Sequence, residues 1–223
     1  MSYRCVATSV AGFIQQLAVG YISNGYYFYV AGVIPHNKPA EKIDSKILAA
    51  YDIAVSRWTR ARRKREGQAS VQYLRYGRFY VIIATDGVHP FFSSEAKCIQ
   101  DVRRRPILFQ NYSIGYCRER GGETYHASVR INRDYFRELK AEFVKRSTRD
   151  SVEELYHAFR RLSFEPYAPI RVQLQVLLRA VNRRRAVAGL DQVPVGALRL
   201  RRKPTRPFES NESDNSRLSL LEN

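Results

Sequence analysis

The chain is poor in cysteine, and its few cysteines are not spaced for metal binding or cross-linking. Its 223 residues include three, at Cys5, Cys98 and Cys117. An odd number without Cys-x-x-Cys spacing indicates neither a disulfide framework nor a zinc ribbon. We therefore expect a reducing, intracellular environment, and neither a metal nor another cofactor.

Long apolar runs are also scarce. The most apolar N-terminal stretch, residues 10–22, is interrupted by Gln15 and Gln16, is too short to cross a bilayer, and lacks a small-residue cleavage pattern. It predicts a core helix rather than a membrane span or a secretion signal. The expected location is cytoplasmic, with no membrane partner.

Acidic residues are few compared with basic ones. Lys and Arg number 38 against 21 Asp and Glu, which gives a formal net charge of +17. This excess is larger than solubility requires of a chain of this length. Because a surplus of positive charge favours polyanions, nucleic acid, either DNA or RNA, is the expected partner. The 44% of hydrophobic residues still suffices for a folded core.

Much of this charge is concentrated in the decapeptide 57–66, which holds six basic residues around the only tryptophan, Trp58. Clustered guanidinium groups repel one another unless an anion lies opposite, so the segment predicts contact with phosphates while Trp58 stacks on an exposed base. The alternative is a solvated charged face whose tryptophan belongs to the core. The segment either forms a helix from an N-cap at Ser56 or is a loop. The basic residues are Arg57, Arg60, Arg62, Arg63, Lys64 and Arg65.

Three further basic clusters point to the same partner. Four separate clusters are harder to attribute to solubility than one, and we expect all of them to position the protein on phosphates. The three further clusters are Arg103, Arg104 and Arg105; Arg183, Arg184 and Arg185; and Arg199, Arg201, Arg202, Lys203 and Arg206.

Aromatic residues alternate with Arg75 and Arg78 over two predicted strands. This pattern is typical of a sheet that presents stacking platforms to single-stranded nucleic acid. The alternative is that the same rings pack in the core. The aromatic residues are Tyr73, Tyr76, Phe79 and Tyr80.

A polar face on the last predicted helix combines Arg171, Gln175, Arg179 and Asn182. Arg, Gln and Asn make bidentate contacts to base edges, so this face suggests a major-groove helix of a helix-turn-helix variant. The preceding linker, 163–169, contains two prolines and is longer than the tight turn of that motif. An ordinary polar helix face is therefore the alternative.

Two pairs of residues have side chains that could take part in catalysis. Asp86 and His89 follow a predicted strand and have the chemistry of a metal ligand or a general base. A turn aspartate and a surface histidine explain them equally well. Cys117 faces His126 in a predicted hairpin, but no third group orients the pair. The four histidines are too scattered to provide the paired ligands of a tyrosine-dependent nuclease or transposase.

Hydrophobic periodicity predicts an α+β fold, with an N-terminal helix, a mainly antiparallel mixed sheet with packed helices, a C-terminal group of three helices and a disordered tail. Expected domains are a sheet domain at 1–132, a helical subdomain at 133–195, and a basic arm with a flexible tail at 196–223. Predicted helices are 10–22, one opened by Pro39, one from Arg133 onward, 151–162 and 170–188, and predicted strands are 26–34, 71–76, 78–85, 112–120 and 123–131. Ser151 and Glu154 form a capping box, and side chains along 79–85 are expected to alternate between two faces.

The functional hypothesis is a nucleic-acid-binding protein that uses arginine clusters on phosphates and aromatic stacking on bases. One alternative is a nucleic-acid-processing enzyme, such as a nuclease, a transposase or a replication initiator. Another is an interaction module for an acidic protein or the ribosome. The sequence leaves open the choice between DNA and RNA, sequence specificity, catalysis and oligomeric state.

Overall fold

The computed structural model describes residues 3–118, 122–202 and 205–209. The described chain divides into two compact units that interleave in sequence, and each is described by itself. The first unit falls within Met1–Ile107, Gly115–Ala127 and Thr205–Asn223, and the second within Leu108–Ile114 and Ser128–Pro204.

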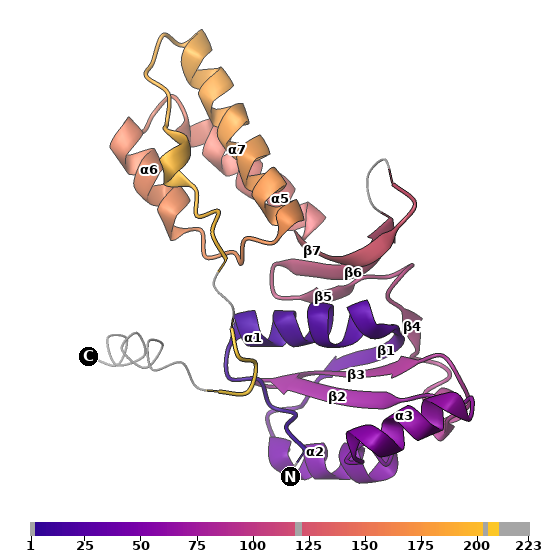
Figure 1. The fold of residues 1–223 in the computed structure, drawn as a ribbon. Helices are drawn as coiled ribbons and strands as arrows, with labels where there is room; N and C mark the ends of the chain where they lie inside the picture. The colour runs from indigo at the N-terminus through magenta and orange to yellow at the C-terminus, as the bar shows by residue number, and fades with distance from the viewer. Residues whose placement is uncertain (1–2, 119–121, 203–204, 210–223) are drawn as a thin grey trace. The chain divides into compact units, whose positions relative to one another are not determined.

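The first unit is built on a four-stranded antiparallel sheet (Figure 1). Its order is β2-β3-β1-β4, so β3 and β1 are central. The predicted strands at 26–34, 71–76 and 78–85 are confirmed, whereas β4 was not predicted, because two residues carry no periodicity. The strands are β1 (Tyr26–Val33), β2 (Val71–Tyr76), β3 (Phe79–Thr85) and β4 (Gln100–Asp101).

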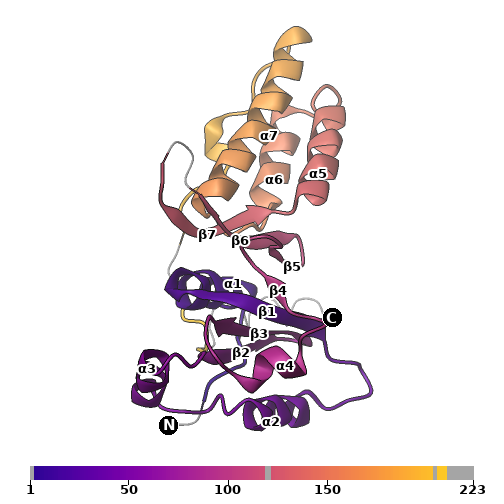
Figure 2. The ribbon, with the colours of Figure 1, turned by 90° about the vertical axis from the view of Figure 1, so that its right-hand side faces the viewer.

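Helices cover both faces of this sheet, with α1 on one side and α2 on the other (Figures 1 and 2). The helix predicted at 10–22 continues from α1 through a π-helical segment and a short 3-10 turn, and it ends at Gly25, whose φ of 89° is left-handed. The elements are α1 (Val10–Gln15), η1 (Gln16–Tyr21), η2 (Ile22–Asn24), α2 (Ala40–Ala50), α3 (Arg57–Arg65) and α4 (Pro90–Ser94).

Side chains of β3 alternate between the two faces, as its sequence predicts. The Phe79 ring lies 5.8 Å from the Phe13 ring of α1. Ile82 points to the opposite face, where it belongs to a buried cluster with Val30 and Phe91. The period-two pattern therefore assigns each strand residue to one of two hydrophobic layers.

A buried ion pair joins α2 to β2. The Arg75 guanidinium donates to Asp44 through Nε at 2.8 Å and Nη2 at 2.7 Å, and the Tyr73 hydroxyl donates to the same carboxylate at 2.6 Å. Burial, together with Asp44, raises the pKa of Tyr73. This is a correction for Arg75, which was expected to contact phosphates: its charge is used inside the first unit.

A second, three-stranded antiparallel sheet has the order β5-β6-β7. Its strands β6 and β7 confirm those predicted at 112–120 and 123–131, although residues 119–121 at the turn lie outside the described residues. Both strands pass from one unit to the other, after Ile114 and after Ala127. The strands are β5 (Ile107–Phe109), β6 (Tyr112–Arg118) and β7 (Tyr125–Ile131).

The second unit carries the three predicted C-terminal helices. Asn132 caps α5, and the predicted capping box of Ser151 and Glu154 opens α6. The rings of Phe143 and Phe159 meet at 4.7 Å in the core between these helices. The elements are α5 (Arg133–Arg146), α6 (Val152–Arg161), α7 (Ala168–Val187) and η3 (Val195–Ala197).

The α+β fold class is thus confirmed. Among the helices that the structure describes, none has the length and apolar character needed to cross a membrane. Lys203 and residues 210–223, the segment expected to be disordered, lie outside the described residues.

Candidate nucleic-acid interface

The decapeptide forms helix α3, most of whose residues are exposed, whereas Thr59, Arg60 and Arg63 are half-buried. Ser56 caps it by accepting a hydrogen bond from the Thr59 amide at 3.1 Å, so the helical alternative at Ser56 is confirmed. No residue of α3 is buried. Trp58 is 84% exposed, which corrects the alternative that this ring belongs to the core.

Three of the six cations on α3 are held by groups of the protein. Arg63 pairs with Asp52, and Arg60 donates to the Val55 carbonyl at 2.6 Å. Arg62 lies 3.9 Å from a glutamate one turn later, which is a loose, exposed pair. The contacts of Arg60 and Arg63 fix the helix to the chain before it.

The other three cations, Arg57, Lys64 and Arg65, are exposed. Within the described residues, none of them has an ion-pair or hydrogen-bond partner for its side chain. Two of them lie in the last turn, where positive charge is favoured by the helix dipole. The helix therefore holds three unneutralised charges facing solvent.

Helix α3 lies at the end of the four-stranded sheet where β2 begins and β3 ends (Figure 1). Gln68, just after α3, pairs with Val88, just after β3. At the same end, Tyr26 at the start of β1 pairs with Thr85. The chain leaving β4 reaches this end too, because the amide after Asp101 donates to the Tyr27 carbonyl at 2.8 Å.

The cluster Arg103–Arg105 follows β4 directly, so the register places it at the same end as α3. Arg103 is oriented by a bidentate contact with Asp101, with Nη2 to Oδ2 at 2.7 Å. Arg104 and Arg105 are exposed. We call α3 and Arg103–Arg105 together the basic end of the first unit.

Beside the basic end, three tyrosine rings form a continuous series in which Tyr125 stacks on Tyr116, and Tyr116 contacts Tyr27 at a tilt of 44°. The rings of Tyr125 and Tyr116 lie 5.8 Å apart and 20° from parallel, and the ring of Tyr116 lies 4.8 Å from that of Tyr27. The Arg103 guanidinium completes the series 4.8 Å from the centre of the Tyr27 ring. We call this set the tyrosine ladder. The sequence places Tyr116 and Tyr125 in one hairpin, but it carries no signal that Tyr27 joins them.

Asp86 and His89 lie near the basic end with local structural roles. Asp86 accepts a hydrogen bond from the next amide at 3.0 Å, and His89 Nδ1 accepts one from the Phe91 amide at 3.0 Å. Burial, and then the nearby charge of Arg63, lower the pKa of His89. The neutral ring therefore carries its proton on Nε2. In the part of the chain that the structure describes, no group of three or more His, Cys, Asp or Glu residues is placed to hold a metal ion.

His89 and the inner side of α3 border a cavity of about 10 Å³, which is room for about one water. Arg60, Arg63 and Tyr51 also line it. Both arginines are half-buried here, and their guanidinium groups are held by the Val55 carbonyl and by Asp52. This packing explains how a helix without a buried residue stays in place.

The aromatic residues expected to form a stacking platform on β2 and β3 serve the core instead. Tyr73 is fully buried, and the rings of Tyr76 and Phe79 lie 6.4 Å and 5.8 Å from that of Phe13. Arg78 donates to backbone carbonyls, including that of Ile34 at 2.8 Å. The core-packing alternative is therefore the correct reading for these rings.

The polar face of α7 is partly occupied by contacts within the second unit. Asn182 exchanges two hydrogen bonds of 2.9 Å with the backbone of Val193, and Arg171 donates to the Pro166 carbonyl at 3.1 Å. Arg179 is exposed. Asn182, one of the side chains expected to contact base edges, therefore holds the loop at Val193 against α7 instead.

The triplet at the end of α7 is split between the surface and the interior. Arg183 and Arg184 are exposed. Arg185 is buried and donates through Nη1 to the carbonyls of Ser147 at 2.7 Å and Asp150 at 2.8 Å. This corrects the expectation for Arg185, whose charge ties α7 to the segment between α5 and α6.

The final basic segment is mixed in the same way. Arg199 and Arg201 are exposed. Arg202 lies over the Tyr167 ring at 4.1 Å from its centre. Arg206 pairs at 2.8 Å with a glutamate three residues later. Of these four, only Arg206 falls in the first unit.

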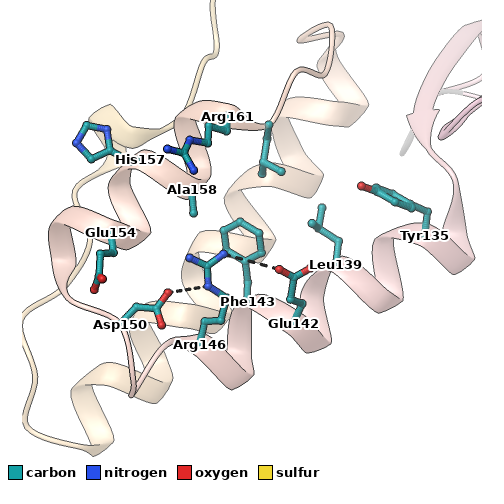
Figure 3. Close-up of a pocket in the computed structure, with 11 residues that line it drawn as sticks. Tyr135, Leu139, Glu142, Phe143, Arg146, Asp150, Glu154, His157, Ala158 and Arg161 are labelled. Atoms are coloured by element: carbon teal, nitrogen blue, oxygen red, sulfur yellow. Dashed lines mark hydrogen bonds and ion pairs between the residues drawn. The ribbon is translucent and has the colours of Figure 1, made fainter. Parts of the chain in front are cut away.

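A groove of about 580 Å³ runs between α5 and α6 in the second unit (Figure 3). Arg146 lies in it between two carboxylates, with Asp150 at 2.6 Å and Glu142 at 3.7 Å. Its guanidinium is thus neutralised within the protein, and the groove offers no free cation at that point.

Of the pair considered in the predicted hairpin, Cys117 is half-buried and His126 is exposed.

Comparison with known proteins gives no relative that would assign this arrangement: the chain matches no protein-family model, no curated protein and no solved structure. The function must therefore be inferred from the geometry and charge described above.

Proposed function

We propose that the protein binds nucleic acid through the basic end of its first unit. The free cations Arg57, Lys64 and Arg65 neutralise backbone phosphates, and Trp58 stacks on an unpaired base. Arg104 and Arg105 extend the same positive surface along the sheet end.

The observation that supports this proposal is the exposure of α3. No residue of α3 is buried, so hydrophobic burial does not explain why this sequence forms a helix on the surface. Its three free cations repel one another in the unbound protein. A phosphate backbone removes that repulsion and releases counterions. A purely solvating face would explain the charges but not the tryptophan, which is 84% exposed among them.

The test is the salt dependence of binding. Fluorescence anisotropy of labelled single-stranded and duplex oligonucleotides is followed across a salt series with the full chain. We expect the logarithm of the association constant to fall linearly with the logarithm of salt concentration. Absence of binding, or binding that does not change with salt, would contradict the proposal.

The same oligonucleotides separate the two alternatives drawn from the sequence. Cleavage with Mg²⁺ or Mn²⁺ that is lost in His89→Ala would establish a processing enzyme. Association with an acidic protein that survives nuclease treatment would establish an interaction module.

A further inference from the structure

The tyrosine ladder has features that core packing does not explain. Tyr125, its outermost ring, is 58% exposed, so burial in the core does not hold it against the neighbouring Tyr116 ring. Even so, the two rings are nearly parallel, with centroids 5.8 Å apart. A half-exposed stack that holds its rings parallel keeps one flat aromatic face open to a ligand.

The inner end of the ladder is rigid. Tyr27 belongs to β1, a central strand, and Arg103 covers its ring while Asp101 orients the guanidinium. Burial, and then a hydrogen bond with Tyr116, raise the pKa of Tyr27 to about 12, so this phenol is uncharged at neutral pH. A neutral, preorganised stack loses little entropy when a further ring is added, and it does not repel phosphate.

The ladder also adjoins concentrated positive charge. Arg103 belongs both to the ladder and to the basic end, and Arg104 and Arg105 follow it in exposed positions. Aromatic faces beside free cations are the combination that binds single strands, because bases stack on the rings while phosphates contact the cations. A duplex hides its base faces inside its own stack and cannot use such a surface.

We propose that the tyrosine ladder is a binding site for unpaired bases, so that the nucleic acid bound at the basic end is single-stranded, with one base stacked on the open face of Tyr125. This inference rests on the proposed function, since it names the ligand class of the same surface. Tyr27, Tyr116 and Tyr125, which no sequence motif marks as functional, thereby gain a role.

The experiment compares Tyr125→Leu and Tyr125→Trp with the unmodified chain. Leucine keeps apolar bulk but lacks a π face, whereas tryptophan keeps one. Binding of a labelled oligothymidylate and of a mixed-sequence duplex of equal length is measured by anisotropy across a salt series. Because the residue is exposed, both variants should fold, and circular dichroism melts check this.

We expect Tyr125→Leu to lower single-strand affinity about fivefold to a hundredfold at every salt concentration, with the salt slope unchanged. Tyr125→Trp should retain single-strand affinity, and duplex affinity should not respond to either variant. These three results together would support the ladder as a base-stacking site.

Other outcomes overturn the inference in distinguishable ways. If Tyr125→Leu changes neither affinity, or changes both equally, the ladder is not a single-strand site, while the proposed function stands as long as the unmodified chain binds with a salt-dependent affinity. If the unmodified chain binds neither oligonucleotide, the proposed function fails and this inference fails with it.

Discussion

Replacing Arg57, Lys64 and Arg65 together by glutamine is expected to weaken nucleic-acid binding and to flatten its salt dependence. These three cations on α3 are exposed, and none has a partner among the described residues. The other three are held by Asp52, by the Val55 carbonyl or loosely by a glutamate, and they are left unchanged.

The magnitude follows from counterion release. Each phosphate contact contributes about 0.7 to the salt slope for a single strand and about 0.9 for a duplex. Loss of three contacts therefore lowers the slope by about 2 to 3. Across a roughly fourfold rise in salt, the unmodified chain should lose about 20- to 40-fold more affinity than the variant.

The assay is anisotropy with one oligonucleotide at several salt concentrations. A matched control carries the same change of net charge at Lys38, Lys42 and Lys46, which are exposed on and just before α2. The segment before α2 follows the end of β1 at Val33, opposite to the sheet end at Tyr26. This control should leave the slope nearly unchanged.

Two results would refute the reasoning. An unchanged slope in the α3 variant would show that these cations do not contact phosphates. An equal flattening in the control would show that net charge acts over the whole surface, so that no defined basic end is needed.

Three further predictions concern single side chains. Because Trp58 is the only tryptophan, its fluorescence should be quenched by an oligonucleotide, and Trp58→Ala should weaken single-strand binding by about 1–3 kcal/mol; unaltered fluorescence at saturation would argue against stacking. Asp44→Ala, which leaves the Arg75 charge buried and unpaired, should lower the free energy of unfolding by about 3–5 kcal/mol in urea, whereas Glu41→Ala at the exposed partner should cost under about 1 kcal/mol; similar losses would contradict the buried pair. The folded-state pKa of His89 lies below its unfolded value, so the unfolded chain takes up the proton first and stability should fall as pH drops below about 6.5; His89→Asn keeps a capping side chain and should remove that part of the pH dependence, and identical profiles for both proteins would exclude it.

Local signals in the sequence predict much of the fold. Ser56 before a run of basic residues predicts the start of α3, and Ser151 with Glu154 predicts the start of α6, because helix caps depend only on neighbours within one turn. Alternation along 79–85 predicts which β3 side chains share a face.

The errors arise where partners are distant in sequence. Arg75 has the sequence context of an exposed cation in a strand. Its neighbours in sequence do not indicate that it pairs in the interior with Asp44, 31 residues earlier. Tyr27 and Tyr116 are separated by most of the first unit. Hydrophobic periodicity and composition predict on which face of a helix or strand a residue lies, but they do not identify the element packed against that face.

The interleaving of the two units affects how the protein is made. Residues 205–209 return to the first unit, where the Pro207 carbonyl accepts a hydrogen bond from the Thr8 amide at 3.1 Å and the Thr205 carbonyl accepts one from Gln15 at 2.5 Å. During translation these contacts form only after α5, α6 and α7 have left the ribosome. The first unit, although it begins first, is completed after the second, and cutting the chain after Ile107 would remove two of the three rings of the tyrosine ladder.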